Sequence, residues 1–385
     1  MRDSIWSLGL RAIRYLARNR RLPKHRVIRY YLRPETISYY LLPGGYSCYP
    51  RALTFELTVR CNLKCAMCWW ANLRGEQKRE YLEEEMSLDE VKDIVDQIRG
   101  RIPAIGFTGG EPFLRKDILE IIEYVTKNGF NLGILTNATL IDKYTARAIV
   151  DFGVDDLGIS IDGKAATHDR IRAVPGSFDR TLNAIRNIQE YKKGKGKEKP
   201  RIRINCVLSS VNVNELDGLV PLAAELGVEL QFQHMMWLTR ETIETHKITV
   251  RKLFSIDDPT AGGFENDLSD FDVEALINKI DQIKKKACEM NVPLFFQQFS
   301  DAEIIRTWYS SQEIPRRSNC LYPYRGARIR ANGNLTPCPF IRYSLGNLKC
   351  ETFSKIWNGE KARYFRKVFK ENGRVFPMCV RCCKA

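Results

Sequence analysis

The stretch Cys61-Asn-Leu-Lys-Cys65-Ala-Met-Cys68 places three thiols within eight residues, directly after an apolar run at 53–57 that is typical of a buried strand. Three thiolates on one short loop can bind three irons of a cubane iron–sulfur cluster and leave the fourth iron without a protein ligand. A substrate or cofactor can bind such an open iron. Part of a zinc site and a chance group of buried thiols remain alternatives.

Around this stretch, strand-like and helix-like segments alternate. The expected strands are 53–57, 102–107, 131–135, 157–161, 202–208 and 228–232, and the expected helices are 87–99, 116–128, 141–151, 178–191, 214–226 and 272–290. Such alternation indicates a parallel sheet with right-handed crossovers. Six units are too few for a closed eight-unit barrel, so a partial barrel and a doubly wound sheet both fit. We expect the lysine-rich run 192–199 to form a solvated loop.

The net charge of +15 among 385 residues is confined to the two ends of the chain. Residues 1–35 carry ten basic and two acidic side chains, and residues 361–385 carry eight and one. The neutral middle makes nucleic acid an unlikely main partner. In the basic leader, apolar residues from Trp6 to Ala17 follow a helical spacing beside a stripe of arginines. This pattern fits an amphipathic helix, either at an anionic membrane surface or packed across the body of the protein.

The cysteine loop resembles the CxxxCxxC signature of the radical S-adenosylmethionine (SAM) superfamily. Consistent with this resemblance, the second expected strand runs into Gly109-Gly110-Glu111, at the place of the family motif that receives the amino group of SAM. Glycines let the backbone approach a ligand closely, and carbonyls with a carboxylate suit an ammonium group. The resemblance implies that Cys61, Cys65 and Cys68 hold a [4Fe-4S] cluster whose open iron binds SAM.

Weaker matches extend the resemblance. It implies SAM contacts for Asn137, Ser160 and Arg172, and places Met67 and Met235 against the adenine. Core packing is the alternative for the methionines. Ala138 stands where the family commonly has glycine. Residues that follow the sixth strand are candidates to face the substrate, namely His234, Trp237 and the loop 238–270.

A second group of cysteines lies near the C-terminus, and its motifs resemble the SPASM/twitch extension of radical SAM enzymes. The resemblance implies one auxiliary [4Fe-4S] cluster in a short, twitch-type module, held by Cys320, Cys338, Cys379 and Cys382. Cys383 and Cys350 remain possible replacements, and zinc remains the alternative metal. Cys48, Cys206 and Cys288 look isolated.

The sequence therefore predicts an α/β radical SAM enzyme with a leader (1–50), a partial (β/α)6 TIM-type barrel (51–300) and a cysteine-rich twitch/SPASM-like domain (301–385). The resemblance implies reductive cleavage of SAM to a 5'-deoxyadenosyl radical that abstracts hydrogen from the substrate. We expect a lipid, lipid-linked or sugar-type substrate, with a peptide as the alternative. A protein that is not an enzyme, either a zinc-binding scaffold or a nucleic-acid binder, is the alternative of another class. With no signal peptide, we expect a cytoplasmic protein, with the leader at the inner face of the membrane, and a reductant such as flavodoxin or ferredoxin.

Overall fold

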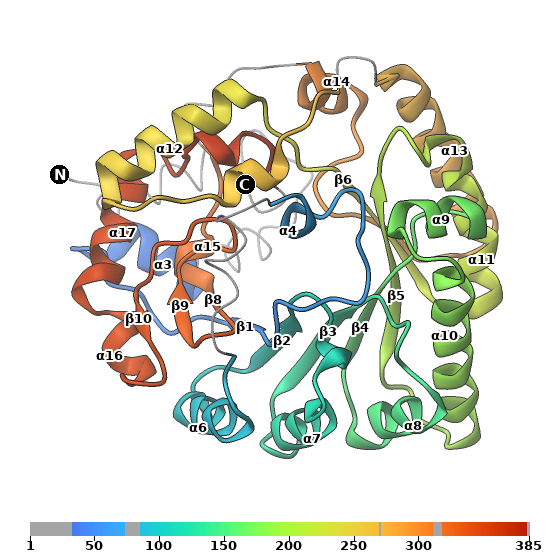
Figure 1. Ribbon diagram of the computed structural model, residues 1–385, viewed down its shortest axis with the longest axis horizontal. Helices are drawn as coiled ribbons and strands as arrows, with labels where there is room; N and C mark the ends of the chain where they lie inside the picture. The colour runs from blue at the N-terminus through green and yellow to red at the C-terminus, as the bar shows by residue number, and fades with distance from the viewer. Residues whose placement is uncertain (1–32, 74–84, 269–270, 311–317, 383–385) are drawn as a thin grey trace.

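The described strands form one continuous sheet in the order β10-β9-β8-β1-β2-β3-β4-β5-β6-β7. The computed structural model describes residues 33–73, 85–268, 271–310 and 318–382 (Figure 1). The strands are β1 (Ala52–Glu56), β2 (Ala104–Thr108), β3 (Asn131–Thr136), β4 (Asp156–Ser160), β5 (Arg201–Leu208), β6 (Glu229–His234), β7 (Leu294–Phe296), β8 (Gly326–Ile329), β9 (Asn334–Thr336) and β10 (Gly346–Asn347).

Helices connect the strands, and five of them (α6, α7, α8, α10 and α11, with the bounds given next) cover the convex side of the sheet (Figure 1). They are α3 (Pro34–Leu41), α4 (Trp69–Asn72), α6 (Leu88–Ile98), α7 (Ile118–Lys127), α8 (Lys143–Phe152), α9 (Ala165–Arg172), α10 (Ser177–Gly194), α11 (Leu219–Leu226), α12 (Arg240–Phe254), α13 (Val273–Glu289), α14 (Ala302–Ser310), α15 (Tyr322–Arg325), α16 (Phe353–Trp357) and α17 (Glu360–Glu371). Four short 3-10 turns are η1 (Pro112–Leu114), η2 (Val213–Gly218), η3 (Thr260–Phe264) and η4 (Pro377–Arg381).

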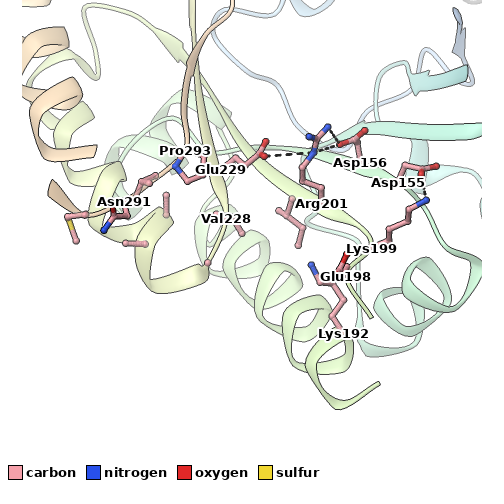
Figure 2. A pocket seen from close by; sticks show the side chains of 16 residues that line it. Asp155, Asp156, Lys192, Glu198, Lys199, Arg201, Val228, Glu229, Asn291 and Pro293 are labelled. Atoms are coloured by element: carbon pink, nitrogen blue, oxygen red, sulfur yellow. Dashed lines mark hydrogen bonds and ion pairs between the residues drawn. The ribbon is translucent and has the colours of Figure 1, made fainter. Parts of the chain in front are cut away.

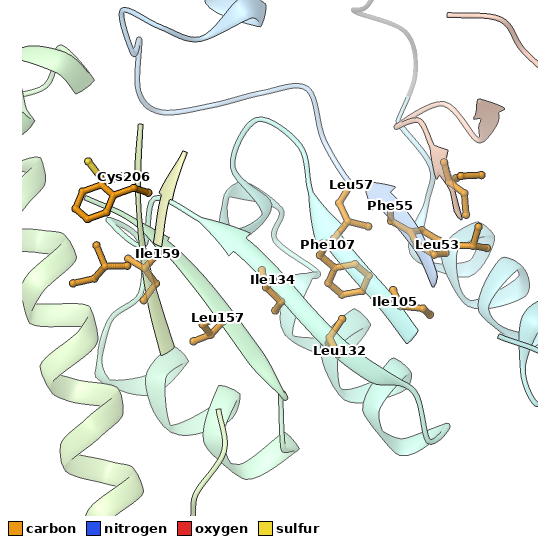
Figure 3. Close-up of a cluster of buried hydrophobic side chains, with 14 of the residues drawn as sticks. Leu53, Phe55, Leu57, Ile105, Phe107, Leu132, Ile134, Leu157, Ile159 and Cys206 are labelled. Atoms are coloured by element: carbon orange, nitrogen blue, oxygen red, sulfur yellow. The ribbon is translucent and has the colours of Figure 1, made fainter. Parts of the chain in front are cut away.

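Strands β1 to β6 run parallel to one another. They follow one another in chain order without the reversal of a doubly wound sheet, and this confirms the expected partial barrel (Figure 1). Their side chains alternate between the two faces. Apolar side chains from β1 to β5 fill the layer between the sheet and the outer helices, as Figure 3 shows for Phe55, Phe107, Ile134 and Ile159. The opposite faces of the strands carry small or polar residues and line the interior of the barrel.

The C-terminal residues extend the barrel sheet at its first strand. β8 pairs in parallel with β1, and β9 and β10 follow in antiparallel pairing. The two parts are also joined across this edge, because Arg330 Nη1 lies 2.9 Å from Oε2 of Glu56. The second group of cysteines is thereby held beside the open side of the barrel.

Two local expectations from the sequence were wrong or incomplete, and a third is not tested. Residues 238–270 are not one loop, because they contain α12 and η3. The polar residues Thr242 and His246 lie on the buried face of α12 and interrupt its apolar stripe, which hid the helix. The lysine-rich run is not wholly a loop either, since α10 continues to Gly194. The expected leader helix lies outside the described residues.

Among the described residues, none of the helices is both long enough and apolar enough to cross a lipid bilayer.

Candidate functional site

The loop with the first three cysteines follows β1 and ends where α4 begins, at the carboxyl ends of the parallel strands. The backbone N–H of Leu63 donates to Sγ of Cys61 at 3.4 Å, and the N–H of Cys68 donates to the carbonyl of Cys65 at 3.1 Å. Burial raises the pKa of Cys61 to about 11, with smaller contributions from the charges of Glu111 and the other two thiols. A raised pKa means that the thiol keeps its proton more strongly, and metal binding would have to displace that proton.

The glycines after β2 are packed against the segment that leads into the cysteine loop. Gly110 donates its N–H to the carbonyl of Thr58 at 2.7 Å, and Glu111 donates to the carbonyl of Arg60 at 2.8 Å. A Cβ atom on Gly110 would lie 2.0 Å from the carbonyl oxygen of Arg60, and one on Gly109 would lie 2.3 Å from that of Thr58. These glycines are therefore required by the close approach of two chain segments, a reason that the sequence did not reveal.

The carboxylate of Glu111 joins the ends of β2 and β3. It is 1% exposed and accepts hydrogen bonds from Thr136 Oγ1 at 2.7 Å, from the N–H of Asn137 at 2.8 Å and from the N–H of Phe113 at 3.1 Å. Burial raises the pKa of Glu111, and these hydrogen bonds oppose the rise. These three hydrogen bonds hold the carboxylate in place between the ends of β2 and β3.

Asn137 links the turn after β3 to the cysteine loop. Its Nδ2 donates to Oδ1 of Asn62 at 3.0 Å, and its Oδ1 accepts the N–H of Thr139 at 2.9 Å. The next residue, Ala138, has a φ of 58° in the left-handed region, where glycine is the residue of least cost. The alanine therefore adopts the backbone conformation of the glycine that is common at this position in the family.

Arg172, at the end of α9, connects the cysteine loop to β4. Its Nη2 lies 2.5 Å from Oδ2 of Asp162, and its Nη1 lies 3.4 Å from Sγ of Cys65. Burial lowers the pKa of Arg172, but the negative charges of Asp162 and Cys65 have a larger opposite effect, so the pKa is raised overall. Its Nε is buried and has no hydrogen-bond partner among the described residues. That donor is available to an acceptor from a bound molecule.

One cavity of about 350 Å³ brings most of the predicted site residues together. It is lined by the three cysteines of the first loop and by Met67, Gly109, Gly110, Glu111, Asn137, Ser160 and Arg172. It is also lined by residues that the sequence did not single out, namely Glu56, Trp69, Trp70, Val207, Arg328 and Phe340. The carboxyl ends of β1 to β5 and the start of the C-terminal module thus share one enclosed space.

His234, at the end of β6, and Met235, directly after it, do not line this cavity. Met235, the expected adenine contact, is 8% exposed and packs in the core. His234 is 1% exposed, stacks on Phe299 with ring centroids 4.4 Å apart, and its ring nitrogens lie 3.2 Å from Tyr309 Oη and from the carbonyl of Phe299. The prediction that His234 faces the substrate is therefore wrong.

Trp237 is buried as well, at 2% exposure. The guanidinium of Arg381 lies over its ring, 3.7 Å from the centroid. Trp237 and parts of the segment 238–270 line a separate cavity of about 640 Å³ that contains none of the cysteines. None of its described residues lines the cavity of the first cysteine loop, but Phe264 stacks on Trp69, which does line that cavity.

The second group of cysteines converges beside β8. The pKa of the Cys379 thiol is raised to about 12, chiefly by burial and further by the charge of Cys320. Burial also raises the pKa of Cys338, with contributions from Cys379 and Cys320. The backbone N–H groups of Tyr322 and Phe340 donate to Sγ of Cys320 and Cys338, each at 3.4 Å.

Cys382 is 9% exposed and comes directly after η4, which contains Cys379. Its backbone N–H donates a hydrogen bond to the carbonyl of Cys379 at 3.3 Å. Cys350 is exposed, and Cys383 lies outside the described residues.

Both cysteine groups share a feature that suits an iron–sulfur cluster. In Cys61, Cys320 and Cys338, the sulfur accepts the backbone N–H two residues further along the chain. Such donors stabilise a metal-bound thiolate. Among the described residues, no three His, Cys, Asp or Glu side chains lie close enough to ligate one metal ion. In a cubane cluster each cysteine binds a different iron, so the cysteine sulfurs do not need to lie within reach of a single metal ion.

Another cavity lies at the opposite end of the barrel, near the amino ends of β4, β5 and β6. It measures about 730 Å³ and its charged side chains pair with one another, as Figure 2 shows for Arg201 with Asp156 and Lys199 with Asp155. Functional groups of parallel barrels gather at the carboxyl ends of the strands, so we assign this cavity no catalytic role.

Comparison with known proteins identifies the two cysteine-bearing parts. Residues 55–198 match the family model of the radical SAM superfamily, and residues 320–383 match the SPASM iron–sulfur cluster-binding domain. The AdoMet-dependent heme synthase of Methanosarcina barkeri is 28% identical over 83% of this chain and 84% of its own length. The mycofactocin maturase MftC of Mycolicibacterium smegmatis is 32% identical over 48% of this chain and 45% of its own length.

Solved structures share the fold. SuiB of Streptococcus suis bound to S-adenosylmethionine has a TM-score of 0.63 at 16% identity, covering 92% of this chain and 77% of its own. The structure of anSMEcpe with bound AdoMet has a TM-score of 0.59 at 18% identity, covering 86% of each chain.

Fold, site and family matches together define an enzyme that uses SAM and [4Fe-4S] clusters as cofactors. The chain belongs to the radical SAM superfamily and carries a C-terminal SPASM domain.

Proposed function

We propose that this enzyme binds SAM in the cavity between the cysteine loop and the strand ends, and that it removes a hydrogen atom from a substrate held beside it. The observation that carries the proposal is the shared cavity, which joins three thiols, the glycine turn, Ser160 and Arg172. When bound, the cluster of Cys61, Cys65 and Cys68 supplies the electron that cleaves SAM to methionine and the 5'-deoxyadenosyl radical.

Backbone and side-chain hydrogen bonds within the protein fix this arrangement. Gly110 and Glu111 tie the turn after β2 to the entry of the cysteine loop, and Asn137 ties the turn after β3 to the same loop. Arg172 contacts the same cysteine loop at Cys65, because its Nη1 donates a hydrogen bond to Sγ of Cys65. We propose that carbonyls of the glycine turn accept the amino group of SAM, and that Ser160 and the free Nε–H of Arg172 face its carboxylate. Met67, which lines the cavity, is the candidate for the adenine contact.

We assign one auxiliary [4Fe-4S] cluster to Cys320, Cys338, Cys379 and Cys382. Burial of the group and the backbone N–H donors to Cys320 and Cys338 support this assignment. Arg330 adds positive charge nearby, which lowers the pKa of Cys338 against the effect of burial. We propose that a cluster at these cysteines would lie near the cavity of the first cysteine loop, because Phe340 lines that cavity and follows Cys338 by two residues; there it could bind the substrate or accept an electron from it.

A lipid, lipid-linked or sugar-type molecule remains the prediction from the sequence, but the relatives named above are a heme synthase and a maturase. The amphipathic stretch of the leader that favoured a lipid, from Trp6 to Ala17, lies outside the described residues, as does the predicted membrane contact at the cytoplasmic face. A flavodoxin or ferredoxin is the expected electron donor.

Anaerobic reconstitution tests the proposal. We expect about eight irons per chain, four for each cubane. Under dithionite, the protein should convert SAM to 5'-deoxyadenosine and methionine. Stoichiometric zinc together with intact SAM would contradict the proposed function.

A further inference from the structure

The short turn η3 packs against α4, the helix that directly follows Cys68. A Cβ atom on Gly263 would lie 2.3 Å from the carbonyl oxygen of Trp69, so only glycine permits this approach of the two segments. Nδ2 of Asn72, the last residue of α4, also donates to the carbonyl of Gly263 at 3.4 Å. The position of α4 beside the first cysteine group therefore depends on η3.

Phe264, the last residue of η3, lies between one aromatic ring from each cysteine group. It stacks on Trp69, which follows Cys68, with ring centroids 6.1 Å apart and ring planes inclined by 22°. It also meets Phe340, two residues after Cys338, at 5.5 Å and nearly at right angles. Phe264 itself is buried. Aromatic rings packed in these two geometries hold one another in a defined orientation, so Phe264 joins the two segments.

A hydrogen-bonded carboxylate ties η3 to the second cysteine group as well. Asp258, two residues before η3, is 2% exposed. Its Oδ1 accepts the N–H of Thr260 at 3.0 Å, and its Oδ2 accepts the N–H of Arg342 at 2.8 Å. Arg342 lies four residues after Cys338. The turn is thus fixed to the segment of Cys338 by a buried hydrogen bond in addition to the contact between rings.

Backbone N–H groups from the same two segments act on the cysteine sulfurs. Burial raises the pKa of Cys68, and the backbone N–H groups of Ala71 and Trp70 in α4 oppose that rise. In the other group, the N–H of Phe340 itself donates to Sγ of Cys338 at 3.4 Å. N–H donors to a ligand sulfur stabilise the reduced cluster, which carries more negative charge, and so raise its reduction potential.

We propose that Phe264 is a positioning residue for both iron–sulfur clusters: by packing between Trp69 and Phe340 it holds the N–H donors of each cysteine group at their sulfurs, and so sets both reduction potentials. The inference rests on the proposed function, because it takes the two cysteine groups as cluster ligands. It goes beyond that function, since η3 lies outside both stretches that match the family models.

A redox titration of the reconstituted holoenzyme, followed by electron paramagnetic resonance without SAM, tests the proposal. Cys68→Ala and Cys338→Ala, which each keep one cluster, assign the signals. In Phe264→Leu the stack is lost, so we expect both reduction potentials to fall while the iron content stays at about eight per chain. Phe264→Tyr keeps the ring and should retain both potentials.

Gly263→Ala tests the contact with α4 by a separate route. The three atoms nearest to the new Cβ all belong to the backbone of Trp69, so this variant displaces α4 and leaves the segment of Cys338 in place. We expect a lower potential for the first cluster and an unchanged potential for the auxiliary cluster. A shift of the auxiliary cluster alone would contradict the proposed arrangement.

Phe232 provides the matched control for Phe264. It stacks on Phe296 with centroids 5.7 Å apart and planes inclined by 27°, it is fully buried, and neither residue adjoins a proposed ligand in the sequence. Phe232→Leu should leave both potentials unchanged. Unchanged potentials in Phe264→Leu would overturn the inference, as would equal shifts in Phe264→Leu and Phe232→Leu. Iron analysis and SAM cleavage by the unmodified protein separate this failure from failure of the proposed function.

Discussion

Arg172 Nη2 lies 2.5 Å from Oδ2 of Asp162, and this buried ion pair fixes the arginine that contacts the cysteine loop. Asp162 is 0% exposed and its Oδ1 accepts the N–H of Val207 from the next strand at 3.0 Å. The carboxylate therefore anchors Arg172 to β5, and the arginine in turn reaches Cys65. The pair couples the stability of the barrel to the position of the first cysteine group.

Removal of Arg172 alone should be strongly destabilising. In Arg172→Gln the carboxylate of Asp162 is left buried without a counter-ion, which costs about 3–5 kcal/mol. The double variant Arg172→Gln/Asp162→Asn should recover part of this loss. Denaturant unfolding measures both. The control is Arg201→Gln, because its ion pair with Asp156 is about half exposed and should cost less than about 1 kcal/mol. Equal losses for the two single variants would contradict this account.

The glycine turn should be intolerant of a single methyl group. In Gly110→Ala the new Cβ would meet the carbonyl of Arg60 at 2.0 Å and would displace the segment that leads into the cysteine loop. We expect the iron content after reconstitution to fall from about eight to about four per chain, because the auxiliary site is left intact. Gly194→Ala is the control, since nothing lies within 4 Å of its added Cβ. A Gly110→Ala protein with full iron content would refute the proposed role of this turn.

The two cysteine groups should lose iron independently. Cys68→Ala should remove about four irons and abolish SAM cleavage, whereas Cys338→Ala should remove the other four. Cys350 is exposed and was a possible replacement ligand, so Cys350→Ala distinguishes the ligand sets. We expect it to keep both clusters, as judged by iron analysis and electron paramagnetic resonance of the reduced protein. Loss of iron in Cys350→Ala would instead assign it as an auxiliary ligand.

Buried histidines should make the fold sensitive to acid. Burial lowers the pKa of His234 to about 4, and it does the same for His168 and His246. Between about pH 6.5 and 4 the unfolded chain binds protons that the folded chain does not, so stability is present above this window and is lost as the pH falls.

In His234→Gln, the loss of unfolding free energy between pH 6.5 and 5.5 should be smaller by about 1 kcal/mol than in the unmodified protein. Denaturant titrations at the two pH values measure this difference. An unchanged pH dependence would show that His234 is not held neutral in the folded state.

The order of the elements and the position of the glycine turn could be predicted because they depend on local pattern. Parallel strands bring their carboxyl ends to one edge, so residues far apart in sequence, such as Cys61, Ser160 and Arg172, were expected together and line one cavity. The sequence could not show that Gly110 is needed for contact with Arg60, because that requires the distance between two segments.

The wrong assignment of His234 had a signal that could have prevented it. In β6 the buried residues Leu230, Phe232 and His234 lie on one face, so the period of two places His234 towards the outer layer. The same alternation in β8 places Arg328 on the inner face, opposite to Ala327 and Ile329. Without the pairing of β8 with β1, however, the sequence does not reveal that this face borders the first cysteine group.

The most direct test of the central claim is the formation of 5'-deoxyadenosine from SAM by the anaerobically reconstituted protein under dithionite, compared with the Cys68→Ala variant. We predict that the unmodified protein forms 5'-deoxyadenosine and methionine in equal amounts and that the variant forms neither. A fully iron-loaded protein that leaves SAM intact, or a variant that cleaves it as well as the unmodified protein, would contradict the account.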